Sequence, residues 1–196
     1  MNNKEIKRLN ILSIILFCIY ILLLIWIVLF KCNIYLSITN GYFEFKTLTL
    51  KERFDYYLIP FIDYFNNDST QTFIKLKDGI LNVFVFIPLG LYLSFFIKNN
   101  KFIKVIIYTF LISLLFEIIQ LFSLLGSFQT EDLILNTFSG LLGYIIYKII
   151  YKEKNIKVLN ILSLICIIIL TPILIYGVIN TINMIDVYIN VITRSL

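Results

Sequence analysis

Five long apolar stretches, separated by shorter polar segments, dominate the pattern of this chain. They cover residues 9–30, 79–97, 102–125, 132–151 and 158–177. A helix of about 20 apolar residues crosses a hydrocarbon core of about 30 Å. The pattern therefore predicts five transmembrane helices in an all-α integral membrane protein, with residues 1–196 forming a single membrane domain.

Composition supports this interpretation. The chain has 196 residues, of which 60% are hydrophobic and 15% are charged, whereas soluble domains are about 45–50% apolar and about 25% charged. Histidine is absent, which excludes histidine zinc sites and Ser-His-Asp triads. Cys18, Cys32 and Cys166 fit no metal-binding spacing. We expect membrane lipid as a partner, no nucleic acid, no metal and no cofactor.

Basic residues predict the orientation of the chain. Ten of the 17 lie in the N-terminal segment and in the two short segments near residues 98–104 and 148–157, while the other segments hold seven, six of them spread over the long first loop. Dense basic residues near span ends mark the cytoplasmic side, so the N-terminus is predicted inside and the C-terminus outside. No small-residue cleavage site follows the first stretch, which we therefore interpret as a retained helix.

The long loop at residues 31–78 contains the run Tyr56-Tyr-Leu-Ile-Pro60-Phe61. This run is too short to span a membrane, and Pro60 would end a helix there. It suits an interfacial or re-entrant segment, and a short amphipathic helix on the membrane surface is an equal alternative. After residue 177, isoleucines recur at helical spacing from Ile182 to Ile192, which predicts a helix along the outer surface.

Several polar residues lie where a bilayer penalises them. An ionised Glu117 near a helix centre costs about 2.5–3.5 kcal/mol, and Gln120 shares its helix face. The outer parts of the neighbouring spans add further carboxylates and carboxamides, and we see no comparable group at the inner side. The candidate ligand-binding residues are Asn82, Glu117, Gln120, Glu131, Asp132 and Asn136. They predict a polar cavity that opens outward between the second, third and fourth spans.

Each of these residues also has a structural interpretation. Buried polar side chains often hold membrane helices together by hydrogen bonds, and Asp132 or Thr130 is placed to cap the fourth helix. Other positions are assigned to structure alone, because proline kinks a helix and small residues allow close packing. These positions are Pro60, Pro88, Gly90, Gly140 and Gly143, with Ser139 in the same small-residue strip.

Four sequence segments together resemble the VanZ-like family. They are Leu58-Ile-Pro-Phe61, Asn82-Val-Phe-Val-Phe-Ile-Pro88-Leu-Gly90, Glu117-Ile-Ile-Gln120 and Glu131-Asp132-Leu-Ile-Leu-Asn136-Thr-Phe-Ser-Gly140-Leu-Leu-Gly143-Tyr144. The resemblance covers residues 53–147. The family's arginine in the turn around Gly126 is missing here, Gln129 stands at its first acid, and Arg53 is one residue away from the usual spacing.

The resemblance implies a bacterial multi-pass cell-membrane protein that lowers susceptibility to lipoglycopeptide antibiotics such as teicoplanin, which carries a lipid tail and acts at the outer membrane face. The outward cavity would engage the drug or an envelope lipid. One alternative is an enzyme acting on a lipid-linked cell-wall precursor, with Glu117 as general acid or base and Asp132 as a second carboxylate or metal ligand. Another is a scaffold subunit of a membrane complex. The lack of histidine and of an obvious nucleophile favours a non-enzymatic role, so no catalytic residue is assigned beyond the candidate Glu117.

Overall fold

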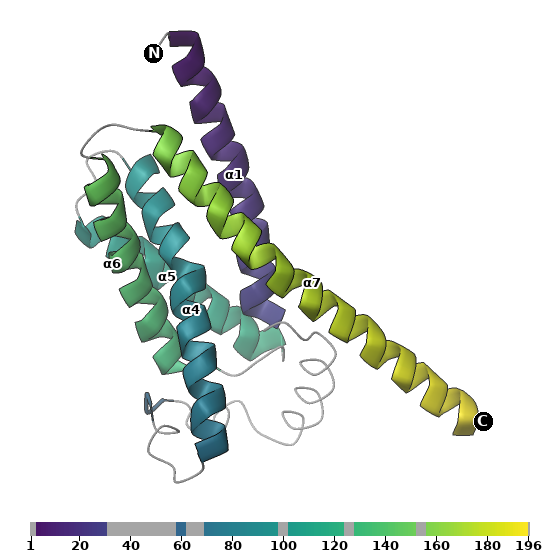
Figure 1. Ribbon diagram of the computed structural model, residues 1–196. Helices are drawn as coiled ribbons and strands as arrows, with labels where there is room; N and C mark the ends of the chain where they lie inside the picture. The colour runs from purple at the N-terminus through teal and green to yellow at the C-terminus, as the bar shows by residue number, and fades with distance from the viewer. Residues whose placement is uncertain are drawn as a thin grey trace.

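The computed structural model describes residues 3–30, 58–61, 69–97, 102–123, 128–151 and 156–195. Its regular elements within these ranges are the helices α1 (Asn3–Phe30), α4 (Ser69–Phe96), α5 (Phe102–Ser123), α6 (Thr130–Tyr151) and α7 (Ile156–Ser195) (Figure 1). All five are long and apolar enough to cross a membrane, which confirms the predicted all-α membrane fold. Cys32, Arg53 and the turn around Gly126 lie outside the described residues.

Four of the five helices, all except α5, extend beyond the apolar stretches that predicted them. α1 begins at Asn3 rather than Leu9, and α4 begins at Ser69, ten residues before the predicted span. The residues expected to form a separate surface helix after residue 177 continue α7 without a break as far as Ser195. Hydropathy detects only the part of a helix that suits lipid, whereas the helix ends where its backbone hydrogen bonding stops.

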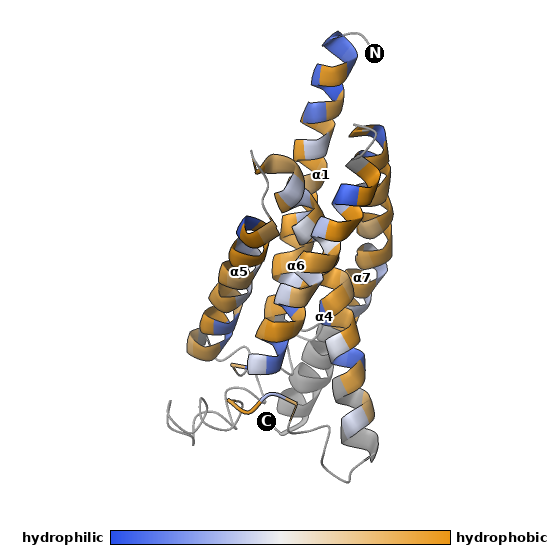
Figure 2. Cartoon of the chain, turned by 90° about the vertical axis from the view of Figure 1, so that its left-hand side faces the viewer, coloured by the Kyte–Doolittle hydropathy of each residue, from blue (hydrophilic) through white to orange (hydrophobic). Residues whose placement is uncertain are grey.

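The helices alternate in direction, so their ends gather at the two ends of the bundle. α1 and α5 finish at the same end at which α4 and α6 begin (Figure 1); we call this the site end. Hydrophobic residues line the flanks of the helices (Figure 2), and many large ones are exposed, including Phe122 and Ile149. Such flanks suit contact with lipid.

The closest helix packing joins α4 and α6 at three glycines. A Cβ atom added to Gly90 would lie 2.7 Å from the Cα of Gly140, and one added to Gly143 would lie 2.7 Å from the backbone nitrogen of Leu91. These distances leave no room for a side chain, so the small-residue strip brings the two backbones into direct contact.

α1 packs against α4 through a buried aromatic core. The Tyr20 ring stacks on Tyr92 with centroids 5.8 Å apart, and the Tyr20 hydroxyl donates a hydrogen bond of 2.8 Å to the carbonyl of Val85. Val85 lies one turn before Pro88, which lacks the backbone N–H that would continue the helix bonding. The Tyr20 hydroxyl therefore bonds the carbonyl next to that of Phe84, which loses its helical partner at Pro88.

A buried polar pair joins α1 to α7 near the end opposite the site end. The Ser13 hydroxyl donates to Oδ1 of Asn160 over 2.5 Å, and Nδ2 of Asn160 donates to the carbonyl of Leu9 over 3.2 Å. Both side chains are buried. This pair was not predicted from the sequence, because a single serine and a single asparagine on distant helices give no local pattern.

Candidate functional site

Glu117 is tied to the beginning of α6. Its side chain is only 1% exposed, and Oε2 accepts a hydrogen bond of 2.8 Å from the backbone nitrogen of Gln129. Gln129 immediately precedes α6, where the helix dipole favours an anion. The carboxyl group in the third span is therefore placed at the positive end of the next helix, which offsets part of the cost of burying a charge there.

This contact shows that α6 begins further inside the bundle than the point where α5 ends. Glu117 lies six residues before Ser123, the last residue of α5, a rise of about 9 Å along the helix. Phe128, two residues before α6, is also buried. Thr130 and Asp132, the expected caps, lie inside the first turn of α6, and Gln129 occupies the preceding position.

Glu131 holds the Leu58–Phe61 segment against the first turn of α6. Its Oε2 accepts a hydrogen bond of 3.2 Å from the backbone nitrogen of Phe61. Phe61 has a φ of 62°, a left-handed conformation that costs most side chains roughly 1–2 kcal/mol. Within residues 58–61 the chain forms a bend and a turn rather than a surface helix, and Leu58 and Ile59 remain exposed.

Gln120 and Asn136 link α5 to its neighbours on two sides. Nε2 of Gln120 donates to the carbonyl of Val28 over 2.9 Å, satisfying a carbonyl in the last turn of α1 that has no helical partner. Nδ2 of Asn136 donates to the Ser113 hydroxyl over 2.9 Å. Both amides are fully buried, and their side-chain oxygens have no hydrogen-bond partner among the described residues.

Asn82 lies at the same end but apart from these contacts. It is half-buried on α4, one turn from Phe86, whose ring meets Phe116 of α5 edge-on at 6.2 Å. Residues four apart share one face of a helix, so Asn82 lies on the face of α4 that is turned toward α5.

The structure thus brings four of the six predicted residues, Glu117, Gln120, Glu131 and Asn136, to the contacts among α1, α5, α6 and the 58–61 segment. It buries Asp132 in the first turn of α6. Glu131 is 8% exposed and Asp132 is 4% exposed, so the acids are largely withdrawn from the surface. Within the described part of the chain, no group of three or more acids and cysteines is arranged to hold a metal ion. The hydrogen bonds of Glu117, Gln120, Glu131 and Asn136 join elements of the fold to one another.

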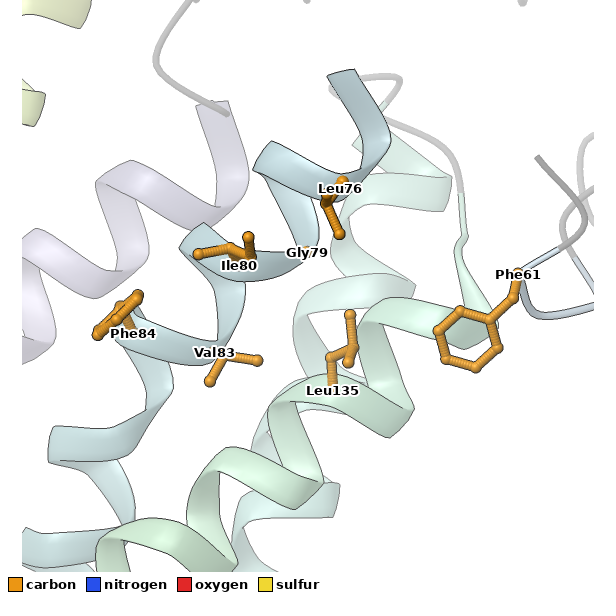
Figure 3. Close-up of a pocket in the computed structure, with 7 residues that line it drawn as sticks. All are labelled: Phe61, Leu76, Gly79, Ile80, Val83, Phe84 and Leu135. Carbon is orange, nitrogen blue, oxygen red and sulfur yellow. The ribbon is translucent and has the colours of Figure 1, made fainter. Parts of the chain in front are cut away.

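An apolar cleft of about 330 Å³ opens beside these residues, between α4 and α6. Figure 3 shows the Phe61 ring directed toward Leu135 of α6, with Leu76 and Val83 of α4 facing them and Ile80 and Phe84 on the other side of α4. The lining is formed by Phe61, Leu76, Gly79, Ile80, Val83, Phe84 and Leu135. None of the six predicted residues lines this cleft, although Glu131 holds the backbone of Phe61 at its edge.

Sequence reasoning did not identify Leu135, Val83 or Ser113 as parts of the site. Leu135 and Val83 are ordinary apolar residues in apolar helices and carry no signal of their own. Ser113 lies four residues before Glu117, so the spacing could have indicated that it shares the face of that acid.

Comparisons with known proteins identify relatives of this chain. The sequence model of the family described as VanZ/LLP1 matches residues 17–151, from α1 to the end of α6. Protein VanZ of Enterococcus faecium is 35% identical over 153 residues, which are 77% of this chain and 83% of that protein. No solved structure matches the chain.

Proposed function

This chain belongs to the VanZ/LLP1 family, and from that premise we propose that it lowers the susceptibility of a bacterial cell to lipoglycopeptides such as teicoplanin. The chain engages the lipid tail of the drug, or of an envelope lipid of similar shape, at the outer membrane face. The apolar cleft between α4 and α6 receives the tail.

The observation that carries this proposal is the uniformly apolar lining of the cleft at the site end. Every lining side chain from Phe61 to Leu135 is hydrocarbon, and Gly79 adds only backbone. Pockets for small molecules usually measure about 300–1,000 Å³, so about 330 Å³ suits one alkyl chain and not a whole glycopeptide. The peptide and sugar parts of the drug would therefore remain outside.

The buried polar residues act as the frame of this cleft. Glu117 fixes the start of α6, which carries Leu135, and Glu131 fixes Phe61. Their hydrogen bonds join three segments that are distant in sequence, so the position of the cleft wall depends on them. This role differs from a polar cavity that binds the drug directly, and it makes the carboxylates positioning residues.

The proposal is tested by expressing the protein in a sensitive host and measuring the minimum inhibitory concentrations of teicoplanin and of a glycopeptide without a lipid tail. We expect a rise for teicoplanin alone, because only that drug offers a chain to the cleft. An equal rise for both drugs, or no rise for either, would overturn the proposal.

Two matched phenylalanine substitutions locate the effect. Val83→Phe adds a ring to the cleft, whereas Leu111→Phe adds a similar volume to an exposed position of α5 that lines no part of it. We expect Val83→Phe to abolish the teicoplanin effect and Leu111→Phe to retain it at equal membrane levels by immunoblot. Full activity of Val83→Phe would show that the cleft is not the site.

A further inference from the structure

A second cleft of about 560 Å³ lies between α4 and α7, on another side of α4. It shares Ile80 and Phe84 with the α4–α6 cleft but contains none of the residues predicted from the sequence as a site. Its lining differs in character, because it combines the polar side chains of Lys77, Asp78 and Tyr176 with an apolar wall.

The cleft exists because α7 does not follow α4 closely at this end. Figure 1 shows α7 leaving the bundle toward the C-terminus, and Pro172, which lines the cleft, interrupts its backbone hydrogen bonding. Proline in a helix commonly causes a kink. Lipid has access to the space, since Phe84 is 66% exposed and Tyr176 is 65% exposed.

The polar and apolar residues lie at different depths. Lys77 is the second residue of the apolar span Leu76–Phe96, and Tyr176 lies three residues before the end of the span Ile156–Ile179. Both therefore lie near the membrane interface, where lysine and tyrosine are commonly found. Phe84 lies seven residues further along α4 than Lys77, about 10 Å deeper in the membrane.

We propose that this cleft binds a membrane phospholipid whose headgroup carries hydrogen-bond donors in addition to its phosphate, such as phosphatidylglycerol. The Lys77 ammonium and the Tyr176 hydroxyl donate to the phosphate oxygens, and one acyl chain packs along Ile80 and Phe84. The Asp78 carboxylate, which lines the same cleft, accepts from the headgroup hydroxyls. A choline headgroup has no such donor.

This proposal is independent of the drug-binding proposal, because it concerns a different cleft and a different ligand. It also holds for either orientation of the chain, since both interfaces of a membrane carry phosphate headgroups.

The test uses the single tryptophan of the chain, Trp26. Trp26→Phe removes it, and Tyr176→Trp then places a fluorescent ring in the cleft while keeping one hydrogen-bond donor. The full-length variant is reconstituted into vesicles that mix phosphatidylglycerol and phosphatidylcholine, with bromine on the acyl chains of one lipid at a time. Bromine quenches tryptophan on contact, so the two series give the relative binding constant at the cleft.

We expect phosphatidylglycerol to be preferred about fivefold, since one basic side chain beside anionic lipid contributes about 1 kcal/mol. Adding Lys77→Gln should reduce the preference almost to parity. Adding Lys104→Gln, which removes an exposed charge from α5 outside the cleft, should leave the preference unchanged. Parity in the starting variant, an unchanged preference with Lys77→Gln, or an equal loss with Lys104→Gln would overturn the proposal.

Discussion

At the scale of single residues, substitutions of Glu117 can distinguish the role of its hydrogen bond to the backbone nitrogen of Gln129 from the role of its charge. Glu117→Gln keeps an oxygen that accepts this hydrogen bond but loses the attraction between a carboxylate and the helix N-terminus, worth about 1 kcal/mol. We expect this variant to fold, to retain the teicoplanin effect and to unfold at a slightly lower temperature in detergent. Thermal unfolding and drug susceptibility measure the two outcomes.

Glu117→Leu is the companion variant, because it removes the acceptor and leaves the partly buried N–H of Gln129 without this partner. Such a loss costs about 1–3 kcal/mol, so we expect poor expression and a clearly lower unfolding temperature. A well-folded but inactive Glu117→Gln variant would contradict this account and would show that the carboxylate itself is needed for function.

The backbone of Phe61 gives a second prediction at this scale. Phe61→Ala and Phe61→Gly both remove the ring from the cleft, but only glycine adopts a φ of 62° without a steric penalty. We expect the glycine variant to be more stable than the alanine variant by about 1 kcal/mol, with the teicoplanin effect lost in both. The reverse order of stability in thermal unfolding would argue against the left-handed conformation.

At the scale of elements, the α4–α6 pair depends on glycines in backbone contact. A methyl group on Gly143 would meet the nitrogen of Leu91 at 2.7 Å and the carbonyl carbon of Gly90 at 2.9 Å, and backbone atoms cannot move away unless the helices separate. We expect Gly143→Ala to destabilise the protein by about 1–3 kcal/mol, measured by thermal unfolding in detergent.

The cleft beside this contact should change with it, because α4 and α6 form its two walls. Gly143→Ala should therefore also weaken the teicoplanin effect at equal membrane levels. Ile149→Ala, at a 70% exposed position of α6, serves as the control and should change neither property. Equal behaviour of the two variants would show that the glycine contact is unimportant.

At the scale of the whole molecule, the alternating directions of the helices fix both termini relative to the site end. The N-terminus, the end of α4 and the beginning of α7 lie toward the other end of the bundle (Figure 1). The basic residues concentrate in those segments, which predicts that this end is cytoplasmic. The site end would then face outward, where a lipoglycopeptide acts.

Topology reporters test this orientation. Alkaline phosphatase fused to the C-terminus should be active, because it folds only outside the cytoplasm, and a green fluorescent protein at the same point should be dark. Fusions of the same reporters to the segment between α4 and α5 should give the opposite result. A fluorescent C-terminal fusion would reverse the orientation and place the site end in the cytoplasm.

The sequence by itself determined the five membrane-spanning helices and the buried carboxyl and carboxamide side chains at the site end. Each residue of a span has to suit the lipid environment on its own. The length of an apolar span can therefore be recognised without knowing which helices pack against it. For the same reason Glu117 and Gln120 were recognised as exceptional. The sequence also indicated the small-residue strip at Gly140 and Gly143, whose spacing lies within one helix.

Only the tertiary structure decided what those polar residues contact. The partner of Glu117 is a backbone nitrogen in the following connection, that of Gln120 is a carbonyl of α1, and that of Glu131 is the nitrogen of Phe61, 70 residues away. Backbone groups are the same at every residue, so no sequence pattern marks them as partners. The recessed start of α6 and the apolar cleft were also not predictable from the sequence, because both depend on how separate helices pack against one another.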